Sequence, residues 1–226
     1  TKKKYRKKLS EMRRYLDIVE IKLVEQDYES SDVSKLPSRA LFRHRHVFKK
    51  YMEEEFNQFL EDVKAGEATL NAVNIYPYEV VAQYINTFLE EGHYFNMIMR
   101  KGTDSRRLEP ILELEATWDA LPDVLPDGSN FNALVVADVS GSMLGNPMAV
   151  AISLGIYSSE RLGGAFKDHF ITFSSKPQLV NIPSVLPLSY RVQEAMTADW
   201  GNSTNIEAVV RLILDTAIKN DTSSEE

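Results

Sequence analysis

The spacing of apolar residues changes character near residue 128. Before that point apolar residues recur at three- and four-residue intervals, which predicts helices joined by polar connections containing Gly or Pro. Pro122, Pro126, Asp127 and Gly128 then form a clear break. The helices predicted before the break cover residues 1–28, about 38–60 with a break midway, 78–90 and 109–120.

After the break the pattern favours alternating strands and helices. Residues 131–137 form a nearly unbroken apolar run, typical of a strand buried on both faces. The fold class expected is therefore α/β plus all-α: a helical N-terminal region over 1–128, followed by a Rossmann-like α/β region over 129–226. The later predicted elements are a helix at 148–161, strands at 168–173 and 178–182, and a helix at 206–219.

Candidate metal ligands follow the apolar strand directly. Asp138, Ser140 and Ser142 stand at i, i+2 and i+4, and ligands of open α/β sheets bind at the carboxyl ends of strands. One carboxylate with hydroxyl oxygens suits a hard divalent cation, Mg²⁺ first, with Mn²⁺ and Ca²⁺ as alternatives. Thr204, in a polar loop before the last helix, is a further oxygen ligand. The alternative is that these residues only cap helices.

These motifs resemble the von Willebrand factor A domain. The shared features are Asp138-Val-Ser-Gly-Ser-Met143 and the Gly-x-x-Thr-Asn-Ile loop that contains Thr204. In that family the Asp, both Ser and the Thr form a metal-ion-dependent adhesion site (MIDAS), which maps onto Asp138, Ser140, Ser142 and Thr204. The resemblance implies a cation whose open coordination position accepts an acidic oxygen from a protein or RNA partner.

The resemblance extends to the helical region. Pro37–Ala40, Ala72–Val80, Trp118 and Trp200-Gly201 are similar to an uncharacterised family in which a TROVE-like helical region precedes a von Willebrand A domain, as in the Ro ribonucleoprotein autoantigen. This implies that the helical region binds RNA. The A-domain family also has a later Asp after a further strand, and this chain reaches Glu226 before one. Residues 129–226 are therefore expected to be the N-terminal half of a truncated A domain.

Charge is distributed unevenly along the chain. Residues 1–50 hold 15 Lys/Arg against 7 Asp/Glu, whereas residues 51–130 hold 5 against 16. The basic residues of the second helix could form a phosphate-binding face, and Tyr5, Phe42, Phe48 and Tyr51 could stack on bases. The alternative is a solvated helix face with the aromatic rings in the core. The candidate nucleic-acid-binding residues are Arg39, Arg43, Arg45, Lys49 and Lys50.

Several function classes are disfavoured. The chain has no Cys, which removes thiolate metal sites and Cys nucleophiles. It has no phosphate-binding Gly-Lys-Ser/Thr loop, and Ser140 stands where an aspartyl-phosphate enzyme needs a second carboxylate, so no enzymatic activity is expected. His44 and His46 point to different sides of a helix and do not suit a shared metal. Without an apolar run of spanning length or a signal peptide, a cytoplasmic protein with no membrane partner is expected.

The function expected from the sequence is therefore cation-dependent binding without catalysis. The first hypothesis is an RNA-binding ribonucleoprotein component resembling Ro. The alternative is a metal-dependent protein–protein interaction module on a helical scaffold that binds no RNA. Loss of binding on charge reversal of Arg39, Arg43 and Lys50 separates the first from the second.

Overall fold

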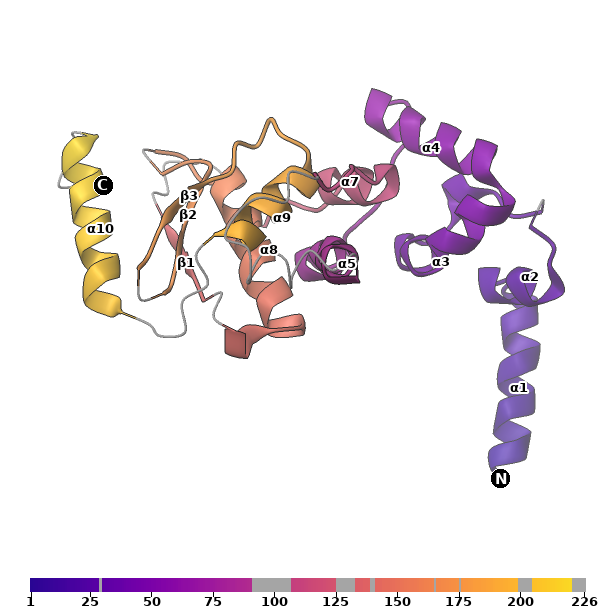
Figure 1. The fold of residues 1–226 in the computed structure, drawn as a ribbon. Coiled ribbons are helices and arrows are strands. Elements are labelled where there is room, and N and C mark those ends of the chain that lie inside the picture. Colours follow the sequence, from indigo (N-terminus) through magenta and orange to yellow (C-terminus); the bar gives the residue numbers. More distant parts are fainter. Residues whose placement is uncertain are drawn as a thin grey trace. The chain divides into compact units, whose positions relative to one another are not determined.

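The computed structural model is largely helical, with a small mixed sheet (Figure 1). This confirms the coarse expectation of helical and α/β structure in one chain. The chain divides into two compact units, Thr1–Asn74 (unit 1) and Ile75–Glu226 (unit 2). In the described part no helix is long and apolar enough to span a membrane. The residues described are 1–28, 30–90, 107–124, 133–138, 141–164, 166–174, 176–198 and 205–220.

Unit 1 begins with two helices where the sequence predicts one over residues 1–28. The prediction is wrong at residues 16–18, where Asp17 adopts φ 46° and ends the first helix. The Asp17 carboxylate pairs with Lys22 Nζ at 3.0 Å, which fixes the turn into the second helix. The elements of unit 1 are α1 (Lys2–Tyr15), α2 (Val19–Glu25), the 3₁₀ turn η1 (Val33–Lys35), α3 (Ser38–Tyr51) and α4 (Glu53–Ala65).

The core of unit 1 depends on the break between α3 and α4. Met52 has φ −139° and ψ 44°, so its backbone leaves the helical conformation. In a continuous helix Phe48 and Phe56 would be separated by about 12 Å along the axis. Here their ring centroids lie 6.1 Å apart, and both side chains are almost fully buried. The predicted midway break is confirmed, because it allows these two rings to pack together.

Unit 2 contains a three-stranded sheet in the order β1-β2-β3. Strand β1 runs parallel to β2, with Val135 opposite Phe170, and β3 is antiparallel to β2. Helix α8 connects the parallel strands, as in a β-α-β unit. The elements of unit 2 are α5 (Pro77–Glu90), α7 (Leu112–Asp119), β1 (Val135–Ala137), η2 (Gly141–Met143), α8 (Asn146–Arg161), β2 (His169–Thr172), β3 (Leu179–Asn181), α9 (Leu188–Thr197) and α10 (Ile206–Lys219).

The strands are shorter than predicted, and β1 is not buried on both faces. Val136 is 40% exposed, because side chains alternate along a strand and Val136 points to the face of the sheet opposite α8. The other face of the sheet is tightly covered. A Cβ added to Gly155 of α8 would meet the Phe170 ring at 3.3 Å, so the absence of a side chain lets helix and strand approach closely.

Helix α9 is an element that the sequence analysis did not predict. Its buried apolar side chains are Leu188, Val192, Ala195 and Met196, each 0% exposed. These positions follow the i, i+4, i+7, i+8 spacing of an amphipathic helix, preceded by Pro187 as a start signal. The pattern was therefore present, but ten residues that directly follow Pro183 and Pro187 were too short to stand out from a loop.

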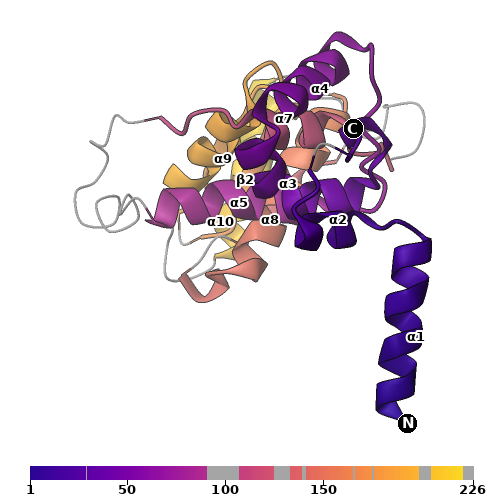
Figure 2. The same cartoon turned by 90° about the vertical axis from the view of Figure 1, so that its right-hand side faces the viewer.

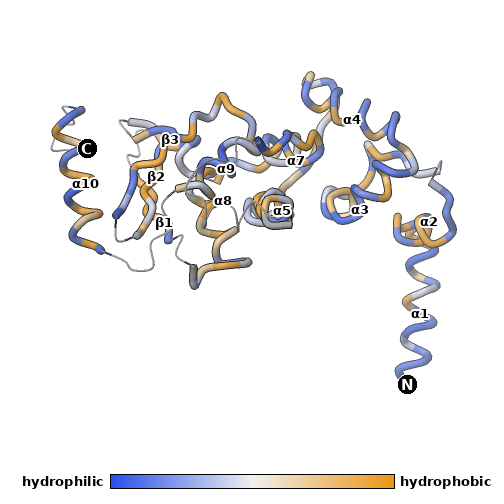
Figure 3. Tube along the Cα trace, viewed as in Figure 1, coloured by the Kyte–Doolittle hydropathy of each residue, from blue (hydrophilic) through white to orange (hydrophobic). Residues whose placement is uncertain are grey.

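Helices α5 and α7 pack with α8 and α9 in the core of unit 2 (Figures 2 and 3). A buried polar cluster joins three of them. Tyr84 of α5 donates its hydroxyl proton to Glu115 of α7 at 2.6 Å. The Glu115 carboxylate also accepts the amide protons of Leu188 at 2.7 Å and Ser189 at 3.1 Å, which open α9. A carboxylate at a helix N-terminus satisfies unpaired amides and matches the helix dipole.

Replacing Tyr84 by Phe should destabilise unit 2 by about 1–3 kcal/mol, because the Glu115 oxygen and the Ile111 amide both lose a buried hydrogen-bond partner. Burial and the adjacent Glu115 charge raise the pKa of Tyr84 above its ordinary value near 10. The unfolded chain therefore loses this proton first, and stability should fall as pH rises above 10. Chemical denaturation from pH 7 to 11 measures both effects; an unchanged alkaline slope in Tyr84→Phe would contradict the assignment.

Candidate functional site

Two of the predicted ligand positions, Asp138 and Ser142, lie in the described chain after β1. Asp138 directly follows β1 and is half-buried, and Ser142 lies exposed in η2, which leads into α8. The pairing of the two parallel strands continues to this edge, because Phe173 donates its amide proton to the Ala137 carbonyl at 2.7 Å. The buried Ser174 follows on the neighbouring strand. Asp138 thus directly follows the carboxyl end of β1, and Ser142 lies four residues later in η2.

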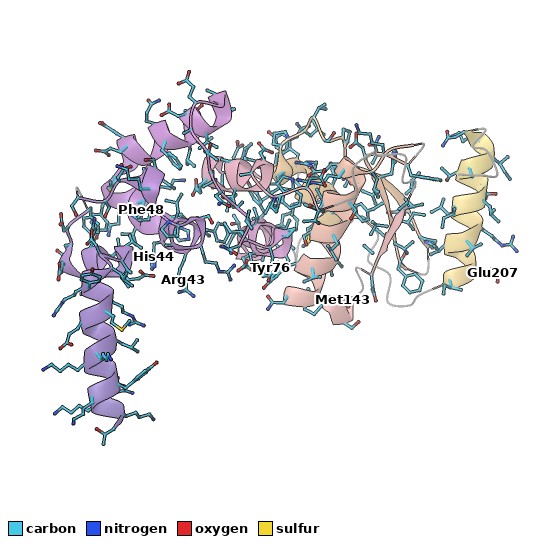
Figure 4. All side chains as sticks on the ribbon, turned by 180° about the vertical axis from the view of Figure 1, so that it is seen from behind. Arg43, His44, Phe48, Tyr76, Met143 and Glu207 are labelled. Atoms are coloured by element: carbon cyan, nitrogen blue, oxygen red, sulfur yellow. The ribbon has the colours of Figure 1, made fainter. Side chains whose placement is uncertain are left out.

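The loop geometry after β1 brings the chain back into a helix. Gly145 adopts φ 89°, a conformation that favours glycine, and its carbonyl accepts a hydrogen bond from the Ala149 amide in the first turn of α8. Met143 lies beside the start of α8 (Figure 4). The turn from strand to helix therefore takes only the residues 138–145, which keeps Asp138 and Ser142 within one loop.

Two of the four predicted ligands, Ser140 and Thr204, lie outside the described residues. The neighbour of Thr204 is nevertheless informative. Asn205 caps α10, and its side-chain oxygen accepts the amide proton of Ala208 at 3.0 Å. The N-cap role considered for Thr204 is therefore filled by another residue.

Within the described part of the chain, no cluster of three or more His, Cys, Asp or Glu side chains could hold a metal ion. The predicted set does not belong to this class of site, since it combines one carboxylate with hydroxyl oxygens. His44 and His46 do not form such a cluster either. His44 lies 3.7 Å from Glu20, whereas His46 is exposed on another side of α3.

A line of basic side chains runs along the exposed side of α3. Arg39, Arg43, His46 and Lys50 are spaced 4-3-4, which places them within about 60° of one another around the helix. All four are exposed, and we name them the α3 basic stripe. Arg39 is oriented by donating to the Asn74 carbonyl at 2.7 Å, and the Lys50 ammonium lies 4.8 Å from the Tyr51 ring centroid. Lys49 is exposed beside the stripe.

Two side chains that the sequence predicts to contact nucleic acid, Arg45 and Phe48, are buried. Arg45 is 7% exposed, donates to the Phe42 carbonyl at 2.7 Å and lies over the Phe42 ring, so its guanidinium cannot reach a phosphate without repacking. Phe48 is fully buried and cannot stack on a base. Tyr51 is half-exposed, but its ring stacks on Tyr28 at 4.4 Å. The α3 basic stripe therefore carries positive charge with little free aromatic surface.

A pocket of about 670 Å³ adjoins the stripe within unit 1. Arg39 and Arg43 are among its lining residues. Lysines that line the same pocket are already paired: Lys35 Nζ lies 2.7 Å from Asp32, and Lys22 pairs with Asp17. The hydrogen bond from Lys35, followed by that from Ser34, lowers the pKa of Asp32 to about 2. Arg39 and Arg43 are the other two cationic side chains that line this pocket.

A second buried polar cluster was not anticipated from the sequence. The Trp118 indole nitrogen donates to the Glu160 carboxylate at 3.1 and 3.2 Å. Glu160 also forms ion pairs with Arg161 and with Arg191, and Arg191 is 3% exposed. The Arg161 guanidinium in turn lies 3.8 Å from the Tyr157 ring centroid. These contacts join α7, α8 and α9, and their interior position favours a structural role.

The comparisons with known proteins divide the chain near the break seen in the sequence. Residues 1–127 match the model of a family described as Domain of unknown function (DUF2828), and residues 132–226 match Domain of unknown function (DUF7788). The chain is 32% identical over 232 residues to Uncharacterized protein L728 of Acanthamoeba polyphaga mimivirus. That match covers 96% of the chain and 37% of the viral protein. No solved structure matches. Because the first model covers more than half of the sequence, the chain belongs to the DUF2828 family.

Proposed function

We propose that the chain is a non-catalytic, divalent-cation-dependent binding protein whose cation site lies at the carboxyl end of β1. The observation that carries the proposal is the position of Asp138 directly after a parallel strand, with Ser142 four residues later in the same loop. Backbone and side-chain oxygens at this edge of an α/β sheet converge on ligands. A carboxylate with hydroxyl groups suits Mg²⁺.

The von Willebrand A resemblance supports the same site. The order β1, α8, β2, β3, with β1 parallel to β2, is compatible with the first half of such a domain. In the proposed site Asp138 supplies the charged ligand, and Ser140, Ser142 and Thr204 supply hydroxyl oxygens. An incomplete protein shell would leave a coordination position open for an acidic oxygen of the partner. The binding would then depend on the cation without any bond being made or broken.

Cation-dependent stability tests the site. Saturating Mg²⁺ should stabilise the full chain by about 2.7 kcal/mol at a concentration of about 100 times Kd, and Asp138→Asn should abolish this gain. Thermal unfolding with Mg²⁺ or with EDTA measures it. Asp215→Asn, which removes an exposed carboxylate of α10, is the matched control and should keep the full response. An equal Mg²⁺ response in wild type and Asp138→Asn would refute the proposed ligand.

RNA is the candidate partner that a specific observation favours. The α3 basic stripe places basic side chains along one line of a helix, and two of its arginines line the adjoining pocket. Such an arrangement suits the phosphates of a nucleic-acid backbone, whose binding releases counterions and depends steeply on salt. The TROVE-like resemblance of the helical region points to the same partner. The protein–protein alternative uses the cation site without the stripe.

Charge reversal separates the two partners. Arg43→Glu with Lys50→Glu should weaken RNA binding at least about tenfold and flatten its salt dependence, because two phosphate contacts are lost. Filter binding over a salt series measures this. Lys64→Glu, an exposed lysine of α4 outside the stripe, is the matched control. Unchanged RNA affinity in the double variant would exclude the stripe. Protein binding that needs Asp138 and tolerates the double variant would favour the protein–protein module.

A further inference from the structure

Helix α1 carries more positive charge than any function described above requires. Its residues Lys2–Tyr15 include eight Lys or Arg against one acidic residue, Glu11. None of its residues is buried. In both views α1 projects from the other helices of unit 1 (Figures 1 and 2), and most of its residues are hydrophilic (Figure 3). A short helix with so little burial is not held by packing, which suggests a binding role.

An apolar stripe runs along the same helix and its C-cap residue Leu16, and of its four residues only Leu9 is half-buried. Tyr5, Leu9, Met12 and Leu16 are spaced 4-3-4, within about 60° of one another around the axis. Tyr5 is 66%, Met12 50% and Leu16 65% exposed. We name these four residues the α1 apolar stripe. Basic residues flank it on both sides, namely Lys2, Arg6 and Arg13 on one and Lys8 on the other.

We propose that α1 binds an anionic phospholipid surface, lying in the interface with the α1 apolar stripe toward the acyl chains. Charge complementarity selects this partner. Each Lys or Arg near an anionic membrane contributes about 1 kcal/mol, so the four basic residues that flank the stripe produce a strong attraction. The apolar side chains then insert at the boundary between headgroups and acyl chains. The long Lys and Arg side chains beside the stripe extend to the phosphates.

Two other partners explain less of the helix. RNA would account for the charge but leaves the α1 apolar stripe in water, because phosphates make no use of Leu9, Met12 or Leu16. An acidic partner helix would use both features. However, α1 offers only about two heptads, and exposed ion pairs contribute about 0–1 kcal/mol each, too little to hold so short a pair together.

This inference departs from the expectation that the protein has no membrane partner. That expectation came from the lack of an apolar run long enough to span a bilayer, and a surface helix needs no such run. The membrane contact is also separate from the cation site, which belongs to unit 2, whereas α1 belongs to unit 1. Binding through α1 should therefore persist in EDTA and in Asp138→Asn.

Vesicle sedimentation in EDTA tests the proposal with the full chain. The chain should bind phosphatidylcholine vesicles containing about 30 mol% phosphatidylserine and should not bind phosphatidylcholine alone, with affinity falling as salt rises. Leu9→Gln with Met12→Gln removes half of the α1 apolar stripe at constant charge and should weaken binding at least about tenfold. Val24→Gln is the matched control, since Val24 is 82% exposed on the neighbouring α2.

Vesicle binding that requires phosphatidylserine and is lost in the Leu9/Met12 variant, but kept in Val24→Gln, supports the membrane contact. Circular dichroism should show unchanged helix content, because Gln is a good helix former and the positions are not buried. The proposal is overturned if the Leu9/Met12 variant binds the vesicles like wild type, or if single-stranded RNA binds through α1 while the vesicles do not.

Discussion

Replacing Glu160 by Ala should lower the free energy of unfolding of unit 2 by about 3–5 kcal/mol, the largest effect we expect from a single substitution. The Glu160 carboxylate pairs with Arg191 and Arg161 and accepts the Trp118 indole proton. Without it the guanidinium of Arg191, which is 3% exposed, stays buried beside the Trp118 ring without this counter-charge. An uncompensated buried charge costs more than the pair itself contributes.

Urea denaturation followed by Trp fluorescence measures this loss, and Trp118 is itself part of the cluster. Glu194→Ala is the matched control, because Glu194 is an exposed glutamate of α9 and should change stability by less than about 0.5 kcal/mol. If the two variants were equally stable, the Glu160 cluster would have no structural role.

Residues 129–226 expressed alone should fail to unfold cooperatively, although the sequence break and the family models both end a region near residue 128. Their helices α8 and α9 are covered by α5 and α7, with Val80, Val81 and Trp118 almost fully buried. Removing that layer exposes several large apolar side chains at about 1.5–3 kcal/mol each. The total is on the order of 10 kcal/mol, comparable with the whole stability of a domain.

The matched comparison is residues 75–226, which correspond to unit 2 and should show a cooperative thermal transition. Near-ultraviolet circular dichroism and thermal melting distinguish the two pieces. A sharp melting transition of residues 129–226 equal to that of residues 75–226 would show that α5 and α7 are dispensable. Helix α5 packs against α8, and α8 follows the loop after β1. Removing α5 and α7 should therefore also disturb that loop.

The spacing of apolar residues predicted β1 and α10, whose apolar side chains recur with the period of a strand or a helix. The run before Asp138 gave β1, and the start and end of α10 agree with the structure at Ile206 and Lys219. Local backbone events were less predictable. The apolar spacing continues smoothly through residues 16–18, and only the positive φ of Asp17 interrupts the helix. A single left-handed residue leaves almost no trace in a hydrophobic pattern.

In the candidate sites, too, some features follow from the order of elements along the sequence and others depend on tertiary packing. The position of Asp138 after a strand follows from the order of elements, so the sequence was sufficient to predict it. Which basic residues of α3 face solvent depends on tertiary packing. Arg45 faces inward while Arg43, two residues earlier, faces outward. The Glu160 cluster joins side chains 31 and 42 residues apart, and no local pattern indicates such a pairing.

Direct binding of Mn²⁺ in place of Mg²⁺ tests the central claim, because the electron paramagnetic resonance signal of the free ion falls as the ion binds. In a titration of the full chain, we predict a saturable site that Mg²⁺ displaces, that Asp138→Asn removes and that Ser142→Ala weakens. Asp215→Asn should bind like wild type. If Asp138→Asn bound Mn²⁺ with unchanged affinity, this result would contradict a cation site at the carboxyl end of β1.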